Sequence, residues 1–212
     1  MSIHYEADLE QGGRSVLGIL PLTWKDGWPL AGDKFKEGTY EIESVRRGYA
    51  LELAVDMVRM AGGMRFGQAN SEPLKPVPFQ ELADANKNWP AGNIALRIGD
   101  YMSRPHQKWT ITDAPDTTGY LGGPYYKIVL AGTERALAAT ADAEVITVPA
   151  FTGGPEQLWR IDQLTDGTYR IMPKIVPNSG KKLALVSSGD STPTLAEFDF
   201  NSDNSRWNFR AH

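Results

Sequence analysis

Three tryptophans recur along the chain at nearly equal intervals, and this period constrains the fold more than any other feature. Trp109, Trp159 and Trp207 are separated by 50 residues (159 − 109) and 48 residues (207 − 159). Each tryptophan opens a short alternating stretch, and the first two have Gln two residues earlier, where the third has Ser205. A fixed period that carries the same strand start indicates an internally repeated, strand-rich fold.

A second motif has the same period and opens each repeat. The sequence GTYEI at 38–42 matches GTYRI at 167–171, and PYYKI at 124–128 is a weaker copy. Each copy leads after a turn into a Leu/Ala strand, then a third strand, then the tryptophan strand. Four short strands cannot bury their own apolar face, so the three repeats must pack around a shared pseudo-threefold axis. We therefore predict an all-β chain whose main part is a β-trefoil, with the three tryptophans in its core.

The same markers predict the domain boundaries. The trefoil should cover residues 34–212, with repeats at approximately 34–113, 114–163 and 164–212. The first repeat carries a proline-rich insertion at 56–92, which is either functional, an interface or a tolerated surface loop. Residues 1–33 lie outside the repeats, and two alternating stretches around Gln11-Gly12-Gly13 predict a β-hairpin. A lone hairpin is barely stable in water, so it should pack on the trefoil or on another domain.

Composition excludes several classes of function. The 212 residues include 22 Lys and Arg against 26 Asp and Glu, and this net charge of −4 argues against a nucleic-acid partner. The absence of cysteine excludes disulfides and Cys-ligated zinc. No apolar run reaches the ~18 residues of a membrane span, and the N-terminal stretch lacks a signal peptide's apolar segment. The three histidines show no ligand spacing, and phosphate-loop and serine-nucleophile motifs are absent, so we expect no cofactor, metal or independent catalytic residues.

The Gln-x-Trp repeats resemble the ricin-B type of trefoil, the fold of many galactose- and xylan-binding lectin modules. In that family each repeat builds a sugar site from an acid in its second strand, an aromatic ring near the end of its third strand, and polar residues at and before the Gln. Such a site accepts hydroxyl hydrogen bonds and stacks on the C–H face of the sugar.

Carried over repeat by repeat, this resemblance implies one sugar site. In the first repeat the acid position falls on Glu52, with Tyr101 as the stacking ring and His106 and Gln107 as polar partners. The acid position holds Ala138 in the second repeat and Ala184 in the third, so both lack the group that selects hydroxyls. An ordinary salt-bridged acid remains the alternative interpretation of Glu52.

Residues 17–33, LGILPLTWKDGWPLAGD, resemble the last strand and exit of the catalytic propeller in family 43 glycoside hydrolases, the endo-arabinanase group, with Leu20 in place of the usual Arg. The continuation at 35–56 resembles the accessory trefoil of some bacterial members. The resemblance implies a propeller partner, in the same parent chain or a separate one, which would hold the catalytic carboxylates. It also implies arabinan or another plant polysaccharide as ligand, and an extracellular or periplasmic location.

Three further tryptophans, Trp24, Trp28 and Trp89, lie in the junction stretch and at the end of the insertion. Aromatic residues anchor interfaces, so we predict domain contact rather than sugar stacking for them. Two functions remain open. The chain is either a module that binds polysaccharide for its enzyme, or a structural domain that packs on the propeller and binds no sugar.

Overall fold

The computed structural model describes residues 2–8, 14–20, 22–25, 27–31, 35–46, 48–55, 89–114, 124–188 and 192–211. The chain forms two compact units. One contains the N-terminal residues up to Lys36, and the other contains the described residues from Glu37 onward.

Two β-hairpins make up the N-terminal unit. Strand β1 (Ser2–Asp8) pairs antiparallel with β2 (Arg14–Leu20), as the alternating pattern predicts. Strand β3 (Leu22–Lys25) pairs with β4 (Trp28–Ala31), and this second hairpin was not predicted. Its turn contains Gly27 with φ of 82°, a left-handed conformation that glycine adopts at little cost.

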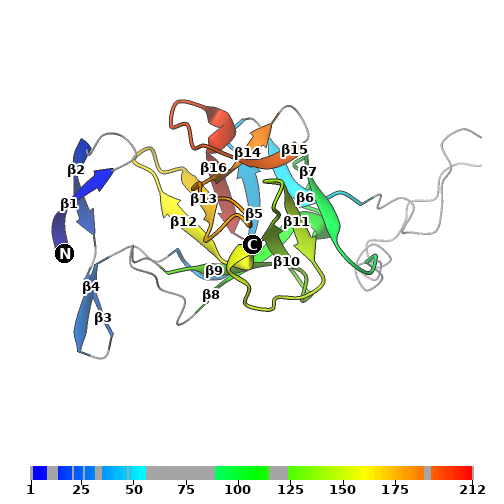
Figure 1. Ribbon diagram of the computed structural model, residues 1–212, viewed down its shortest axis with the longest axis horizontal. Helices are drawn as coiled ribbons and strands as arrows, with labels where there is room; N and C mark the ends of the chain where they lie inside the picture. Colours follow the sequence, from blue (N-terminus) through cyan, green and yellow to red (C-terminus); the bar gives the residue numbers. More distant parts are fainter. Residues whose placement is uncertain are drawn as a thin grey trace, which may run out of the picture. The chain divides into compact units, whose positions relative to one another are not determined.

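The second unit contains three repeats of four strands, as predicted (Figure 1). The first repeat has β5 (Gly38–Ser44), β6 (Tyr49–Leu53), β7 (Ile94–Asp100) and β8 (Lys108–Asp113). The second has β9 (Tyr126–Leu130), β10 (Ala136–Ala139), β11 (Val145–Val148) and β12 (Trp159–Gln163). The third has β13 (Tyr169–Pro173), β14 (Ala184–Ser188), β15 (Thr192–Ala196) and β16 (Trp207–Ala211). A single 3₁₀ turn precedes each tryptophan strand: η3 (Pro105–Gln107), η4 (Pro155–Gln157) and η5 (Asp203–Ser205).

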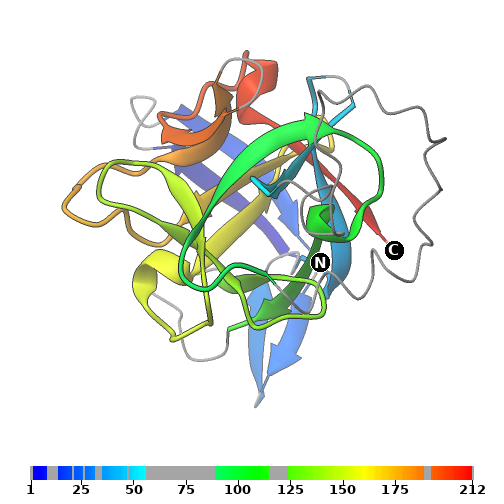
Figure 2. The same ribbon diagram turned by 90° about the vertical axis from the view of Figure 1, so that its right-hand side faces the viewer.

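The first and last strands of the repeats close into a six-stranded barrel. Within repeats β5 pairs with β8, β9 with β12 and β13 with β16, and between repeats β8 pairs with β9, β12 with β13 and β16 with β5. Closure leaves no open edge in this ring of strands. The remaining strands pair as β6–β7, β10–β11 and β14–β15, so each repeat adds one hairpin to the barrel. In Figure 2 the strands of the three repeats surround a common centre. The fold is therefore a β-trefoil.

Equivalent residues from the three repeats fill the barrel in layers. The tryptophans are fully buried, and they are followed two positions later by Ile111, Ile161 and Phe209. The first strands contribute a second set, Ile42, Ile128 and Ile171, all with 0% exposure. At the next inward positions lie Tyr40, Tyr126 and Tyr169, and the Phe209 ring meets Tyr40 and Tyr169 edge-on with centroids 5.9 and 5.1 Å apart. The three repeat tryptophans therefore lie in the core of the barrel.

Each core tryptophan also makes the same hydrogen bond. The indole Nε1 of Trp109, Trp159 and Trp207 donates to the carbonyl oxygen of Leu51, Leu137 and Leu185, at 3.0, 3.0 and 2.8 Å. Each acceptor lies in the second strand of the same repeat. The sequence separation is 22 residues in the second and third repeats (159 − 137; 207 − 185) and 58 in the first (109 − 51). The first repeat thus accommodates 36 extra residues (58 − 22) without losing this contact.

Arginines hold both ends of the insertion predicted at 56–92, of which residues 56–88 lie outside the described part of the chain. Arg135, only 6% exposed, donates to the carbonyl oxygens of Gly92 at 2.6 Å and Pro90 at 2.7 Å. Arg97 Nη2 lies 3.4 Å from the carbonyl oxygen of Val55. Burial lowers the pKa of Arg135. The second repeat therefore fixes the point at which the insertion returns to the barrel.

The layered core predicts the cost of truncating its central side chain. Trp159 is fully buried and donates a buried hydrogen bond, so Trp159→Ala should lower the free energy of unfolding by ~3–5 kcal/mol. Equilibrium denaturant unfolding measures this value. Trp24→Ala is the matched control because Trp24 is 69% exposed, and its cost should stay within ~0.5 kcal/mol. A loss below ~1 kcal/mol for Trp159→Ala would contradict the layered core.

Candidate functional site

Three of the four residues predicted to bind sugar in the first repeat lie in a buried cluster around Glu52. Strand β6 places Glu52 opposite Arg97 of β7, and the η3 turn brings His106 and Gln107 to the same carboxylate. The Glu52 side chain is reached by Arg97 Nε at 2.5 Å, Gln107 Nε2 at 2.7 Å and His106 Nε2 at 3.1 Å. Three of the four residues are at least 96% buried, and only Arg97 is partly open to solvent, with 46% of its side chain exposed.

The Glu52 carboxylate is held in its charged form. Burial alone would raise the pKa of Glu52, but hydrogen bonds and charge from His106 and Arg97 outweigh burial, and the net pKa lies below its ordinary value. The backbone also adapts to the carboxylate, because a side chain at Gly99 would collide with the Glu52 oxygens. The cluster is therefore an ion-pair and hydrogen-bond network in which protein donors occupy both carboxylate oxygens, while the buried Nδ1 of His106 has no hydrogen-bond partner among the described residues.

Tyr101 is not part of this cluster. Its ring lies beneath Arg210 of β16, with Cζ of Arg210 4.5 Å from the ring centroid. A hydrogen bond to Glu41 is the main cause that raises the pKa of Tyr101. The structure thus brings three of the four predicted sugar-binding residues together and places the fourth on the barrel wall. Their sugar-binding role stays a prediction, and the saturated oxygens of Glu52 favour a structural role for that carboxylate.

The tryptophan hydrogen bonds define which residues are equivalent to Glu52. Glu52 directly follows the acceptor Leu51, so its equivalents are Ala138 and Val186. Ala138 agrees with the sequence alignment of the repeats. Ala184 was wrong as the third position, because the alignment of that repeat was displaced by two residues. The conclusion is unchanged, since neither alanine nor valine can accept a hydroxyl hydrogen bond.

The residue two positions before each tryptophan holds the preceding loop. Gln107 accepts from the backbone N–H of Met102 at 3.0 Å, and Gln157 accepts from that of Thr152 at 2.7 Å. Ser205, which replaces Gln in the third repeat, lies 3.4 Å from the backbone nitrogen of Asp199. The motif therefore fixes the loop between the third and fourth strands, and this contact requires no ligand.

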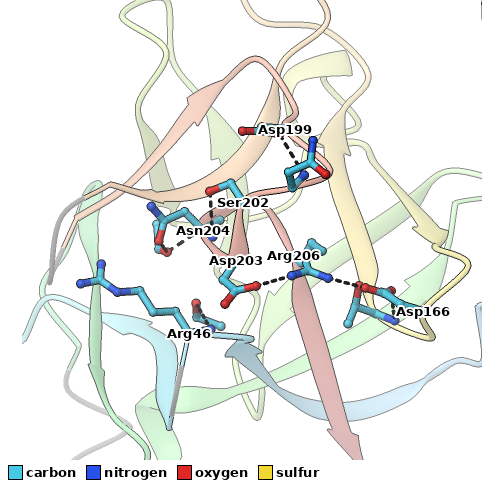
Figure 3. A network of polar contacts seen from close by, with 11 residues as sticks. Arg46, Asp166, Asp199, Ser202, Asp203, Asn204 and Arg206 are labelled. Carbon is cyan, nitrogen blue, oxygen red and sulfur yellow. Dashed lines mark hydrogen bonds and ion pairs between the residues drawn. The ribbon is translucent and has the colours of Figure 1, made fainter. Parts of the chain in front are cut away.

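A second polar network, which sequence analysis did not find, lies in the third repeat. Arg206 bridges Asp166 of the β12–β13 turn and Asp203 of η5 (Figure 3). The hydrogen bonds from Thr168 are the main cause that lowers the pKa of Asp166 to about 2, and Arg206 adds to this shift. The backbone oxygen of Arg206 accepts from Val45 at 3.2 Å. The backbone hydrogen bond from Val45 thus joins the third repeat to the first, next to the ion pairs of Arg206.

The predicted interface tryptophans differ in their surroundings. Trp24 lies in β3 and is 69% exposed, while Trp89 is half-buried and has a buried Nε1 without a hydrogen-bond partner in the described part of the chain. Trp28 begins β4, and its side chain lies outside the described part of the structure. Within the described ranges, no three His, Asp or Glu side chains are grouped to hold a metal ion. None of the helices described has the length and apolar character needed to cross a membrane.

Comparison with known proteins shows a family similarity over part of the chain. Residues 105–197 match the family described as "Ricin-type beta-trefoil lectin domain-like". No curated protein matches the chain in sequence. This match covers less than half of the chain, which is thus similar to that family over these residues, and the fold is a β-trefoil.

Solved structures with low sequence identity share the fold. A mosquitocidal holotoxin is 15% identical with a TM-score of 0.57, over 87% of this chain and 18% of its own. A designed 3-fold symmetric protein, ThreeFoil, is 22% identical with a TM-score of 0.50, over 82% of this chain and 98% of its own. A Polyporus squamosus lectin, solved with a human-type influenza-binding epitope, is 17% identical with a TM-score of 0.52, over 84% of this chain and 50% of its own. The chain thus spans less than a fifth of the toxin and half of the lectin.

The Glu52 network predicts a pH-dependent contribution to stability. Because the folded pKa of Glu52 is depressed, the stabilisation is complete above its unfolded pKa, near 4.5, and is lost as pH falls through the folded value. At neutral pH, Glu52→Gln should lower the free energy of unfolding by ~2–3 kcal/mol, because it removes hydrogen bonds to a charged group.

Denaturant unfolding of both proteins from pH 7 down to pH 3 measures this contribution. The difference between wild type and Glu52→Gln should shrink below pH ~4.5, while the wild type loses stability. Asp166 is retained in both proteins, so its own acid titration cancels. A difference that is constant across this range would show that the charge of Glu52 does not stabilise the fold.

Proposed function

We propose that the chain is a non-catalytic accessory trefoil of an arabinan-degrading glycoside hydrolase, which packs on the catalytic propeller and binds plant polysaccharide. The ricin-type match supports an accessory module of the lectin-like kind. The resemblance of residues 17–33 to the exit of a family 43 propeller supports the choice of enzyme. The catalytic carboxylates would then belong to the propeller, in the same parent chain or in a separate one.

The exposed Trp24 is the observation that carries the packing role. Trp24 lies in the β3–β4 hairpin and is 69% exposed, whereas tryptophan side chains are usually buried to a large extent. Such a side chain anchors an interface when a partner buries it. A propeller that meets this hairpin would bury Trp24.

The purely structural alternative has its own supporting observation. The hydroxyl-selecting position is occupied by protein donors in the first repeat and is apolar in the other two. A trefoil with this pattern could stabilise or shape the cleft of its enzyme without binding sugar.

Reconstitution with the family 43 propeller tests the packing role. The propeller alone should be unstable or weakly active, and adding this chain should restore arabinan hydrolysis. Trp24→Ala should weaken the association at least tenfold, because ~1.4 kcal/mol or more is typical of a central aromatic anchor. Phe200→Ala is the control, since Phe200 is a 42% exposed aromatic residue in the trefoil unit. A propeller that is fully stable and active alone would refute the packing role.

Calorimetry with arabino-oligosaccharides separates the two alternatives. A polysaccharide-binding module should release heat at millimolar sugar, and it should retain binding in Glu52→Gln if Glu52 is structural. No heat at millimolar concentration would contradict sugar binding and leave the structural alternative.

A further inference from the structure

Every repeat places an aromatic ring after its third strand and covers it with a cation from a barrel hairpin. Lys127 Nζ lies 5.7 Å from the ring centroid of Phe151. Arg170 Cζ lies 5.1 Å from that of Phe198, and Arg210 Cζ lies 4.5 Å from that of Tyr101. These are cation–π distances, and in each pair the ring follows the third strand of a repeat.

The three cations lie at the same level of the strand pairs between repeats, Lys127 and Arg170 on the first strand of a repeat and Arg210 on the last, but their charges are not balanced alike. Arg170 pairs across the strands with Asp162, whose carboxylate lies 3.0 Å away. Arg210 pairs across with Glu41, and its guanidinium lies 3.2 Å from Glu43. The partner of Lys127 is Thr112, which carries no charge. Arg170 and Arg210 therefore each have a carboxylate neighbour, although Asp162 also pairs with Arg160 at 2.6 Å, whereas Lys127 faces an uncharged side chain.

Lys127 has no ion pair with any residue in the described part of the chain. The hydroxyl of Thr112 opposite it is buried and has no hydrogen-bond partner among the same residues. Thr112 on β8 thus faces Lys127 on β9, and the ring of Phe151, from the loop after β11, lies next to Lys127.

A second ring and cation lie beside the first. Tyr125 precedes Lys127 by two residues, so both lie on the same side of an extended chain, roughly 7 Å apart. Lys174 Nζ lies 5.0 Å from the ring centroid of Tyr125. Tyr125, Lys127, Phe151 and Lys174, here termed the aromatic–lysine row, are all half-buried, and so remain partly accessible to solvent.

We propose that the aromatic–lysine row binds a uronic-acid residue of a polysaccharide. The carboxylate of the sugar pairs with Lys127, which lacks a protein carboxylate, and the C–H face of the ring packs on Phe151. A neutral sugar has no charge that could pair with Lys127, and a simple anion has no apolar face that could stack on Phe151. The proposal rests on the polysaccharide-binding part of the proposed function, and it assigns that binding to the second repeat rather than to Glu52.

Titration of the full chain with trigalacturonate and its fully methyl-esterified form tests the proposal, since the ester keeps the rings and removes the charge. At low salt the acid should bind about fivefold tighter than the ester, the upper range of a solvent-exposed ion pair. Lys127→Met should abolish that difference, and Phe151→Ala should weaken both ligands. NMR titration suits the millimolar affinities expected here, and the same spectra establish that each variant is folded.

Lys181→Met is the matched control, because Lys181 is a 72% exposed lysine in an ion pair with Glu197, and it should retain the preference for the acid. Equal binding of acid and ester, or an unchanged preference in Lys127→Met, would overturn the proposal. An unchanged affinity in Phe151→Ala would also overturn it, because the row would then be a general anion site. Arabino-oligosaccharide binding without uronate binding would defeat this inference alone, whereas failed reconstitution with the propeller would defeat only the packing role.

Discussion

The hydrogen bond from each core tryptophan to the second strand of its repeat is the contact on which the rest of the structure depends. The indole is fully buried, so its N–H must find an acceptor, and the carbonyl of Leu51, Leu137 or Leu185 provides one. This bond ties the last strand of a repeat, which belongs to the barrel, to the hairpin that packs against it. Repeated three times, it fixes the relation of barrel and hairpins and leaves the loops between strands free to vary.

Because the tryptophan hydrogen bonds fix the barrel and the hairpins, the loops between the strands can differ in length. The first repeat gains 36 residues between its second and third strands, and its tryptophan contact is unchanged because Arg135 and Arg97 hold the backbone where the insertion begins and ends. Gln107, Gln157 and Ser205 fix a different loop, each by accepting from a backbone N–H. The Gln-x-Trp motif is thus explained by hydrogen bonds within the protein, to the backbone and to the side chains of Glu52 and Thr152, which is why its presence identifies the fold and not a ligand.

The sequence was sufficient for the fold because the core obeys a local rule in every repeat. Tryptophan, isoleucine and tyrosine recur at fixed spacing, because the positions that they occupy face the core and must hold large apolar or aromatic side chains. The site was predicted less well because it depends on pairings across long sequence distances. Nothing in the sequence around Glu52 indicates that Arg97, 45 residues away, closes over its carboxylate. The Arg206 network and the cation over each aromatic ring were missed for the same reason. In the third repeat the sequence alignment was displaced by two residues, to Ala184 instead of Val186. Where sequence similarity is weak, the structure is needed to establish which residues are equivalent.

Symmetry in the core makes departures from symmetry on the surface informative. A half-buried charge loses part of its hydration, and a neighbouring carboxylate offsets that loss. Asp162 serves Arg170 and Glu43 serves Arg210, yet the equivalent position opposite Lys127 holds a threonine. The barrel does not require this difference, because at the other two strand pairs the cation has a carboxylate neighbour. Lys127 has no carboxylate partner in the described part of the chain, so it is the cation of the three to which an external anion can bind without displacing a protein group.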